Sequence, residues 1–183
     1  STLEIPEKVG GRYSVFSPVG LYPLAVLDVD IEELLEGAQK ARERCLSTSV
    51  FENPAARSAA TIYENKIQGN DIHDLFLYGK DLEMIGKWYR QLTAESVGKE
   101  FDKDGEQAHT GITPITSIGS TDLHSMAQLY LGGPYDKLHS FVWVEKNNSK
   151  VEIPELSEYT DLVDDIDGLE MKKVMKAIFE GVN

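Results

Sequence analysis

The chain has 183 residues, of which 41% are apolar and 27% charged, so it can form one globular domain with a proper core. Its net charge of −13 argues against nucleic acid as a partner, because a phosphate backbone requires a basic protein surface. No apolar run reaches the roughly 18 to 20 residues of a membrane span and no signal peptide is recognisable, so we expect no membrane partner.

Five segments have the patterns of α-helices. Asn53 followed by Pro54 is typical of a helix start, and Gly98 is typical of a helix end. Cys45, the single cysteine, lies on the apolar face of the second helix, where we expect a small core residue in a reducing, cytoplasmic compartment. The predicted helices cover residues 14–27, 30–46, 53–67, 81–97 and 169–180, and a shorter helix is expected after Ser120.

Three segments predict β-strands, at residues 74–78, 112–118 and 139–144. The first two are short apolar runs between helices, which is typical of a parallel sheet covered on both faces. We therefore predict an α/β protein in which residues 1–183 form a single domain, with the acidic segment 155–168 as a loop.

Ligands of such folds bind at the carboxyl ends of the strands, so the turn at Gly10, the end of the helix 81–97 and the loop after Ile118 are candidate sites. In the first of these, Gly10 and Gly11 have no Cβ and let the backbone approach a ligand closely. Arg12 follows at the start of a helix, where backbone N–H groups also favour an anion. The alternative is a plain turn beside a solvated arginine, and the triplet alone does not distinguish the two.

Glu95 is the second candidate, in the last turn of the helix 81–97. The negative end of the helix dipole disfavours an ionised carboxylate at this position, which suits a general base. Gln91 lies one turn earlier on the same face, so both side chains can contact one ligand. The alternative is a solvated surface glutamate.

His124 is the third candidate, within "GSTDLHSMAQL". Ser120 or Thr121 is the expected N-cap of a helix, and Asp122 lies in its first turn. The positive end of a helix disfavours an imidazolium ion, so a neutral His124 can accept a proton there. The alternative is an ordinary core or surface histidine. No spacing typical of metal ligands occurs, so we predict no metal site.

The three segments in this order resemble the glucose-6-phosphate isomerase (phosphoglucose isomerase) family. "VGGRYSVFSPVGL" is similar to the GGR[FY]S signature of that family, "QLTAESVGK" to its glutamate motif, and "GSTDLHSMAQLYLGG" to the TDLHSMGQ form of bacterial members. The glutamate motif departs from the usual QLxMESNGK, because Ala94 replaces Met and Val97 replaces Asn. The resemblance extends over residues 5–134 and is faint beyond them.

The resemblance implies a sugar-isomerase (SIS) domain, which is a flavodoxin-like, three-layer αβα sandwich with a mainly parallel sheet of about five strands. It also implies that this chain is the second domain of a two-domain enzyme. Two elements of the family are not found here: the Ser/Thr-rich loop that binds the sugar phosphate, and a C-terminal segment with a lysine that helps ring opening. The implied partners are a small sugar phosphate and, for the full-length enzyme, a second copy in a homodimer.

The activity implied by the resemblance is the interconversion of glucose 6-phosphate and fructose 6-phosphate through a cis-enediolate, with no metal or other cofactor. Glu95 would be the base that moves the proton, and Arg12 would stabilise the enediolate. His124 would assist opening of the sugar ring and would reach the site of the neighbouring subunit. Gln91 and Gly11 would contact the substrate.

Two other functions stay open from the sequence. A related isomerase that also accepts mannose 6-phosphate would differ in the residues around the C2 hydroxyl group. A non-catalytic sugar-phosphate-binding domain could use the same fold, but it would have no need of a base beside a cation that stabilises an enediolate.

Overall fold

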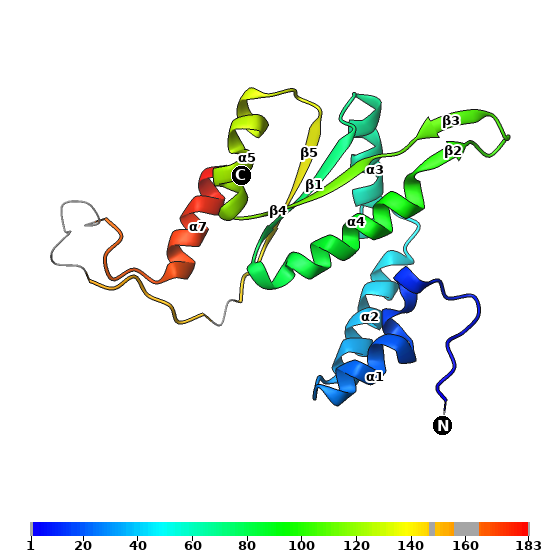
Figure 1. Cartoon of the computed structure of the whole chain (residues 1–183), viewed down its shortest axis with the longest axis horizontal. Helices are drawn as coiled ribbons and strands as arrows, with labels where there is room; N and C mark the ends of the chain where they lie inside the picture. Colours follow the sequence, from blue (N-terminus) through cyan, green and yellow to red (C-terminus); the bar gives the residue numbers. More distant parts are fainter. Residues whose placement is uncertain (1, 147–148, 156–164, 183) are drawn as a thin grey trace. The chain divides into compact units, whose positions relative to one another are not determined.

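The computed structural model describes residues 2–146, 149–155 and 165–182 and forms two compact units, Ser1–Gln68 and Gly69–Asn183. The first contains helices alone, and the second contains a sheet with helices around it (Figure 1). We call them the helical unit and the sheet unit and describe each by itself. A single domain over residues 1–183 stays a prediction.

The helical unit contains four helical segments. The sequence predicts one helix over residues 14–27, but Ser17 interrupts it in an extended conformation, with φ −107° and ψ 175°. The reason is Pro18, whose ring keeps the preceding residue extended and whose fixed φ suits the first position of a new helix. The segments are η1 (Gly11–Phe16), a 3-10 helix, and the α-helices α1 (Pro18–Val26), α2 (Ile31–Cys45) and α3 (Pro54–Ile67).

Side-chain caps fix the starts of α2 and α3. Asp30 Oδ1 accepts hydrogen bonds from two first-turn N–H groups at 3.0 and 2.9 Å. Asn53 Oδ1 accepts the Ala56 N–H at 3.0 Å, so the predicted start of α3 is confirmed. Cys45 is exposed at the end of α2, so its predicted place in a core is wrong. The half-buried residues of α2 end at Ala38, and the rest of the helix is exposed.

Three parallel strands form the sheet, in the order β4-β1-β5. They are β1 (Ile72–Tyr78), β4 (Thr113–Ile118) and β5 (Lys137–Trp143). All three coincide with the predicted strands, so the α/β class and the parallel sheet are confirmed.

The described residues give this sheet three strands, where the resemblance implied about five. Two further strands, β2 (Lys99–Phe101) and β3 (Gln107–Thr110), form a separate antiparallel hairpin beyond the end of α4 (Figure 1). Every residue of these two strands is exposed, so no part of the hairpin is packed in the core of the sheet unit.

Helices cover both faces of the sheet. Successive side chains of β1 point to opposite faces, so β1 presents side chains to the helices on each side. α4 packs on one face through Gly86, where an added Cβ would come within 2.3 Å of the Thr116 methyl group. α5 and α7 pack on the other face through the rings of Tyr130 and Phe179. The helices of this unit are η2 (Lys80–Leu82), a 3-10 helix, and α4 (Glu83–Val97), α5 (Thr121–Gly132) and α7 (Met171–Val182).

The core of the sheet unit is an aromatic cluster on the face covered by α5 and α7. The ring of Phe76, which is 1% exposed, lies 5.4 Å from that of Tyr78 and 5.5 Å from that of Phe141. Phe179 of α7 packs edge-on against Tyr78 and stacks with Trp143, with centroid distances of 5.0 and 5.2 Å. These aromatic rings pack together over one face of the sheet.

Among the residues that the structure describes, no helix is both long and apolar enough to cross a bilayer. The segment 155–168, predicted to be a loop, lies largely outside the described residues, because 156–164 are not among them.

Candidate functional site

Gln91 and Glu95 interact near the end of α4. Gln91 Nε2 donates a hydrogen bond to Glu95 Oε1 at 3.0 Å, as expected for two residues one turn apart on the same helix face. Both residues are exposed. The carboxylate is therefore oriented by a neutral amide and accessible to a ligand, as a proton-transferring base must be.

The end of α4 lies at the end of the sheet where the parallel strands begin. α4 follows β1 and runs back along the sheet, so its C-cap, Gly98, lies beside Gly111, where an added Cβ would be 3.3 Å from Gly98 Cα. The prediction that this helix end lies with the carboxyl-end loops is therefore wrong. A cavity of about 290 Å³ lies here, lined by Lys87, Arg90, Gln91, Ala94 and Pro114.

His124 lies at the opposite edge of the sheet, exposed in the first turn of α5. Asp122 holds the start of this helix: its Oδ2 accepts the Ile118 N–H at 2.6 Å, and its Oδ1 accepts the Ser125 hydroxyl at 2.8 Å. Ser120 occupies the predicted N-cap position, but its side chain makes no capping hydrogen bond. Its backbone is already helical, with φ −93° and ψ −5°. Asp122 instead joins the first turn of the helix to the end of β4 through Ile118.

The end of α4, which carries Glu95, and the start of α5, which carries His124, are separated by the length of β4 (Figure 1). The six residues of this strand span roughly 17 to 20 Å at about 3.3 Å per residue. The helices that carry the two residues also cover opposite faces of the sheet. One copy of the chain therefore does not bring Glu95 and His124 together around one small ligand.

Gly11 and Arg12 belong to the helical unit. Gly11 begins η1, and an added Cβ there would meet no atom within 4 Å, so the backbone is open on that side. Arg12 lies at the start of a helix, as predicted, and its guanidinium carbon is 4.8 Å from the centroid of the Tyr13 ring, a cation–π contact. The roles of Gly11 and Arg12 toward a substrate stay predictions.

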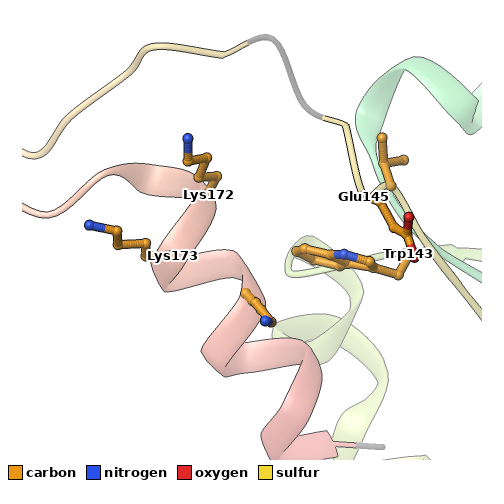
Figure 2. A pocket seen from close by; sticks show the side chains of 6 residues that line it. Trp143, Glu145, Lys172 and Lys173 are labelled. Atoms are coloured by element: carbon orange, nitrogen blue, oxygen red, sulfur yellow. The ribbon is translucent and has the colours of Figure 1, made fainter.

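A cavity of about 480 Å³ at the carboxyl end of β5 was not anticipated from the sequence. Figure 2 shows Trp143 and Glu145 on one side of it and Lys172 and Lys173, from the first turn of α7, on the other. The two ammonium nitrogens lie 2.6 and 3.6 Å from Glu170, and the hydrogen bond from Lys172 lowers the pKa of that carboxyl group. Paired lysines therefore line this cavity. Within the described ranges, no three His, Cys, Asp or Glu side chains gather as they would around a metal ion.

The parallel sheet with helices on both faces defines an α/β domain. The family model described as "Phosphoglucose isomerase" matches residues 1–142, and the chain belongs to this family.

Curated relatives carry the corresponding name. The chain is 41% identical over 162 residues to a protein named glucose-6-phosphate isomerase from Carboxydothermus hydrogenoformans, covering 88% of this chain and 35% of that protein. It is 40% identical over 161 residues to one of the same name from Methanocaldococcus jannaschii, covering 88% of this chain and 37% of that protein. The chain thus spans about a third of the length of these relatives.

Two solved structures resemble the chain. A crystal structure of a hypothetical protein from Thermus thermophilus matches with a TM-score of 0.87 and 34% identity, over 97% of this chain and 41% of that one. A glucose-6-phosphate isomerase from Chlamydia trachomatis matches with a TM-score of 0.79 and 20% identity, over 97% of this chain and 33% of that one. The second likeness supports the fold.

Proposed function

We propose that this chain is part of a longer aldose–ketose isomerase that interconverts glucose 6-phosphate and fructose 6-phosphate. The observation that carries the proposal is the exposed Gln91–Glu95 pair, a positioned carboxylate at a helix end in a member of the phosphoglucose isomerase family. The relatives named glucose-6-phosphate isomerase support this substrate pair. The remainder of the enzyme would supply the phosphate-binding loop and the ring-opening lysine.

The difficult step is removal of a weakly acidic proton next to a carbonyl group. Glu95 would take the proton from C2 of the open-chain aldose and return it to C1, and Gln91 would hold the substrate beside it. Negative charge develops on the enediolate oxygen during this transfer, and Arg12 would stabilise it. The open backbone side of Gly11 would let the chain lie against the sugar. None of these steps requires a cofactor.

The separation of Glu95 and His124 supports a homodimer as the active form. Since the two residues lie at opposite edges of one sheet, His124 of one copy would assist ring opening in the site that contains Glu95 of the other copy. Each site of a two-fold dimer would then contain one residue of each kind.

The remaining expectations follow the same proposal. The helical and sheet units would form one sugar-isomerase domain. The ligand would be a sugar phosphate rather than a nucleic acid or a membrane surface, and the compartment would be the cytoplasm. A related enzyme that also accepts mannose 6-phosphate is the second candidate, because nothing in the described site selects the configuration at C2.

The test is a coupled assay of the full-length protein with fructose 6-phosphate and, in parallel, mannose 6-phosphate. We expect turnover of the first alone. Turnover of both would favour the second candidate, and binding of a sugar phosphate without turnover would reduce the protein to a binding domain. The isolated chain 1–183 is expected to have little or no activity, because the phosphate loop and the lysine lie outside it.

A further inference from the structure

The centre of the sheet carries two adjacent buried polar residues, His73 and Asp74 of β1. They are 4% and 0% exposed, and because successive side chains of a strand alternate, they point to opposite faces. His73 faces α4, the helix that carries Glu95. Asp74 faces α5, the helix that carries His124. Buried polar groups require partners, so each must be hydrogen-bonded on its own face.

On the α5 face, a hydrogen-bonded chain joins the sheet to the helix. Ser117 Oγ of β4 donates to Asp74 Oδ2 at 3.0 Å, and His139 Nδ1 of β5 lies 3.0 Å from the same oxygen. The hydroxyl group of Tyr130 lies 2.8 Å from Ser117 Oγ. Tyr130 is thereby connected to the buried carboxylate through one serine.

The direction of this chain follows from the chemistry of its members. The hydroxyl group of Ser117 is the donor to Asp74 Oδ2, so its single proton points to Asp74. Tyr130 must therefore donate to the Ser117 oxygen. Burial raises the pKa of Tyr130 to about 12, which keeps the phenol protonated and able to donate at neutral pH. The hydrogen bonds therefore run from Tyr130 through Ser117 to Asp74.

On the α4 face, His73 has a comparable arrangement. Its Nδ1 contacts the Tyr89 hydroxyl of α4, and its Nε2 lies 2.8 Å from Ser140 Oγ of β5. Burial lowers the pKa of His73 and raises that of Tyr89, so both are neutral at pH 7. A neutral His73 can accept from Tyr89 and donate to Ser140. Each helix is therefore hydrogen-bonded to the sheet through one half-buried tyrosine.

The spacing on α5 relates this tie to the site. Tyr130 follows His124 by six residues, which is about one and two-thirds helical turns, or roughly 120° short of two full turns. When Tyr130 faces the sheet, His124 must face away from it. We propose that Tyr130, acting through Ser117 and Asp74, is a positioning residue that fixes the rotation of α5 and thereby the direction of the His124 imidazole. The kinetic part of this inference rests on the proposed function.

The test compares Tyr130→Phe with Tyr89→Phe in the full-length protein. Both variants remove one half-buried tyrosine hydroxyl that is hydrogen-bonded to the sheet, so both should lower stability, but only Tyr130 lies on the helix of His124. Tyr135→Phe is a surface control, since Tyr135 is 89% exposed. The imidazole signals of histidine labelled with ¹³C at Cε1 are recorded, with His124 assigned through His124→Gln.

We expect Tyr130→Phe to shift the His124 signal and leave that of exposed His109 in place, whereas Tyr89→Phe and Tyr135→Phe leave both in place. In turnover, Tyr130→Phe should lower kcat about tenfold or more. The isotope effect of C2-deuterated glucose 6-phosphate should fall toward one, because ring opening becomes slower than proton transfer. Ser117→Ala should reproduce these effects, and the double variant should be no worse than either single one.

The outcomes separate the two proposals. If the wild-type protein has no isomerase activity, the proposed function fails, and the imidazole signal still tests the positioning role. An unchanged His124 signal in Tyr130→Phe would overturn the positioning role whatever the activity. Equal changes in Tyr130→Phe and Tyr89→Phe would also overturn it, because they would indicate a general loss of packing.

Discussion

Helices α4 and α5 pack on opposite faces of the same sheet and carry their site residues at opposite ends. Glu95 lies in the last turn of α4, where the strands begin, and His124 lies in the first turn of α5, where the strands end. The means of attachment also differ. α4 approaches the sheet closely at Gly86, which has no side chain, while the first turn of α5 is held by hydrogen bonds to Asp122.

This difference shows that one copy of the chain does not place Glu95 and His124 close to each other. A strand followed by a helix returns the chain to its starting edge, so a residue late in that helix and a residue early in the next are separated by a full strand length. In the proposed homodimer, association of two copies would bring Glu95 of one copy and His124 of the other to the same ligand.

The largest expected effect comes from Glu95, the residue proposed to move the proton. Glu95→Gln in the full-length enzyme should lower kcat by about 10²- to 10⁴-fold, because the amide cannot act as a base. His124→Gln should have a smaller effect, since sugar rings also open without catalysis. Both are measured in the coupled assay, with circular dichroism to check folding. Equal losses in the two variants would contradict this division of roles.

The close approach of α4 gives the next prediction. Gly86→Ala should lower the free energy of unfolding by about 1–3 kcal/mol, because the new methyl group would collide with Thr116. Gly37→Ala is the matched control in α2, where an added Cβ meets no atom within 4 Å; it should raise stability by about 0.5–1 kcal/mol. Urea unfolding measures both changes. An unchanged free energy of unfolding in Gly86→Ala would show that α4 does not pack closely on the sheet at Gly86.

The start of α5 gives a smaller effect. Asp122→Ala should cost about 1 kcal/mol, because it leaves the Ile118 N–H and the Ser125 hydroxyl without their acceptor. Ser120→Ala should change stability by less than about 0.5 kcal/mol, because the Ser120 side chain makes no capping hydrogen bond. Thermal unfolding of the two variants side by side shows which of the two side chains stabilises the start of the helix.

The smallest effect concerns pH. Burial lowers the pKa of His73 from its ordinary 6.5, so the unfolded chain binds a proton at a pH where the native protein does not. The contribution to stability is complete above about pH 6.5 and is lost as the pH falls toward the native pKa. His73→Gln should therefore show a weaker fall of the urea midpoint between about pH 7.5 and 5.5. His109→Gln, which replaces an exposed histidine, is measured beside it as the control.

Much of the fold could be predicted from local patterns. Asp30, Asn53 and Pro54 mark helix starts through their own side chains, so the bounds of α2 and α3 agree with the sequence. The strands were visible as apolar runs. In α4, however, helical spacing favours Ile85 and Trp88 as the packed side, yet they are 53% and 38% exposed. Whether a helix packs on the sheet through a glycine depends on the residues of the sheet that face it. A single sequence does not show which residues those are.

The candidate site was predictable in part, for the same reason. Gln91 and Glu95 form a pair because their spacing within one helix determines it. The prediction of the end of the sheet at which they lie was wrong, because this end depends on the direction in which α4 runs after β1. The buried partners of Asp74 come from elements far apart in the chain, so no local pattern could indicate them.

Complementation between two impaired variants tests the two-copy site most directly. Full-length Glu95→Gln and His124→Gln proteins are mixed in equal amounts, unfolded and refolded together, and assayed with fructose 6-phosphate. If each site combines Glu95 of one copy with His124 of the other, half of the dimers contain one intact site, and about one quarter of the wild-type activity should return. If the mixture regains no more activity than the separately refolded variants, both residues act within one copy, and the account is contradicted.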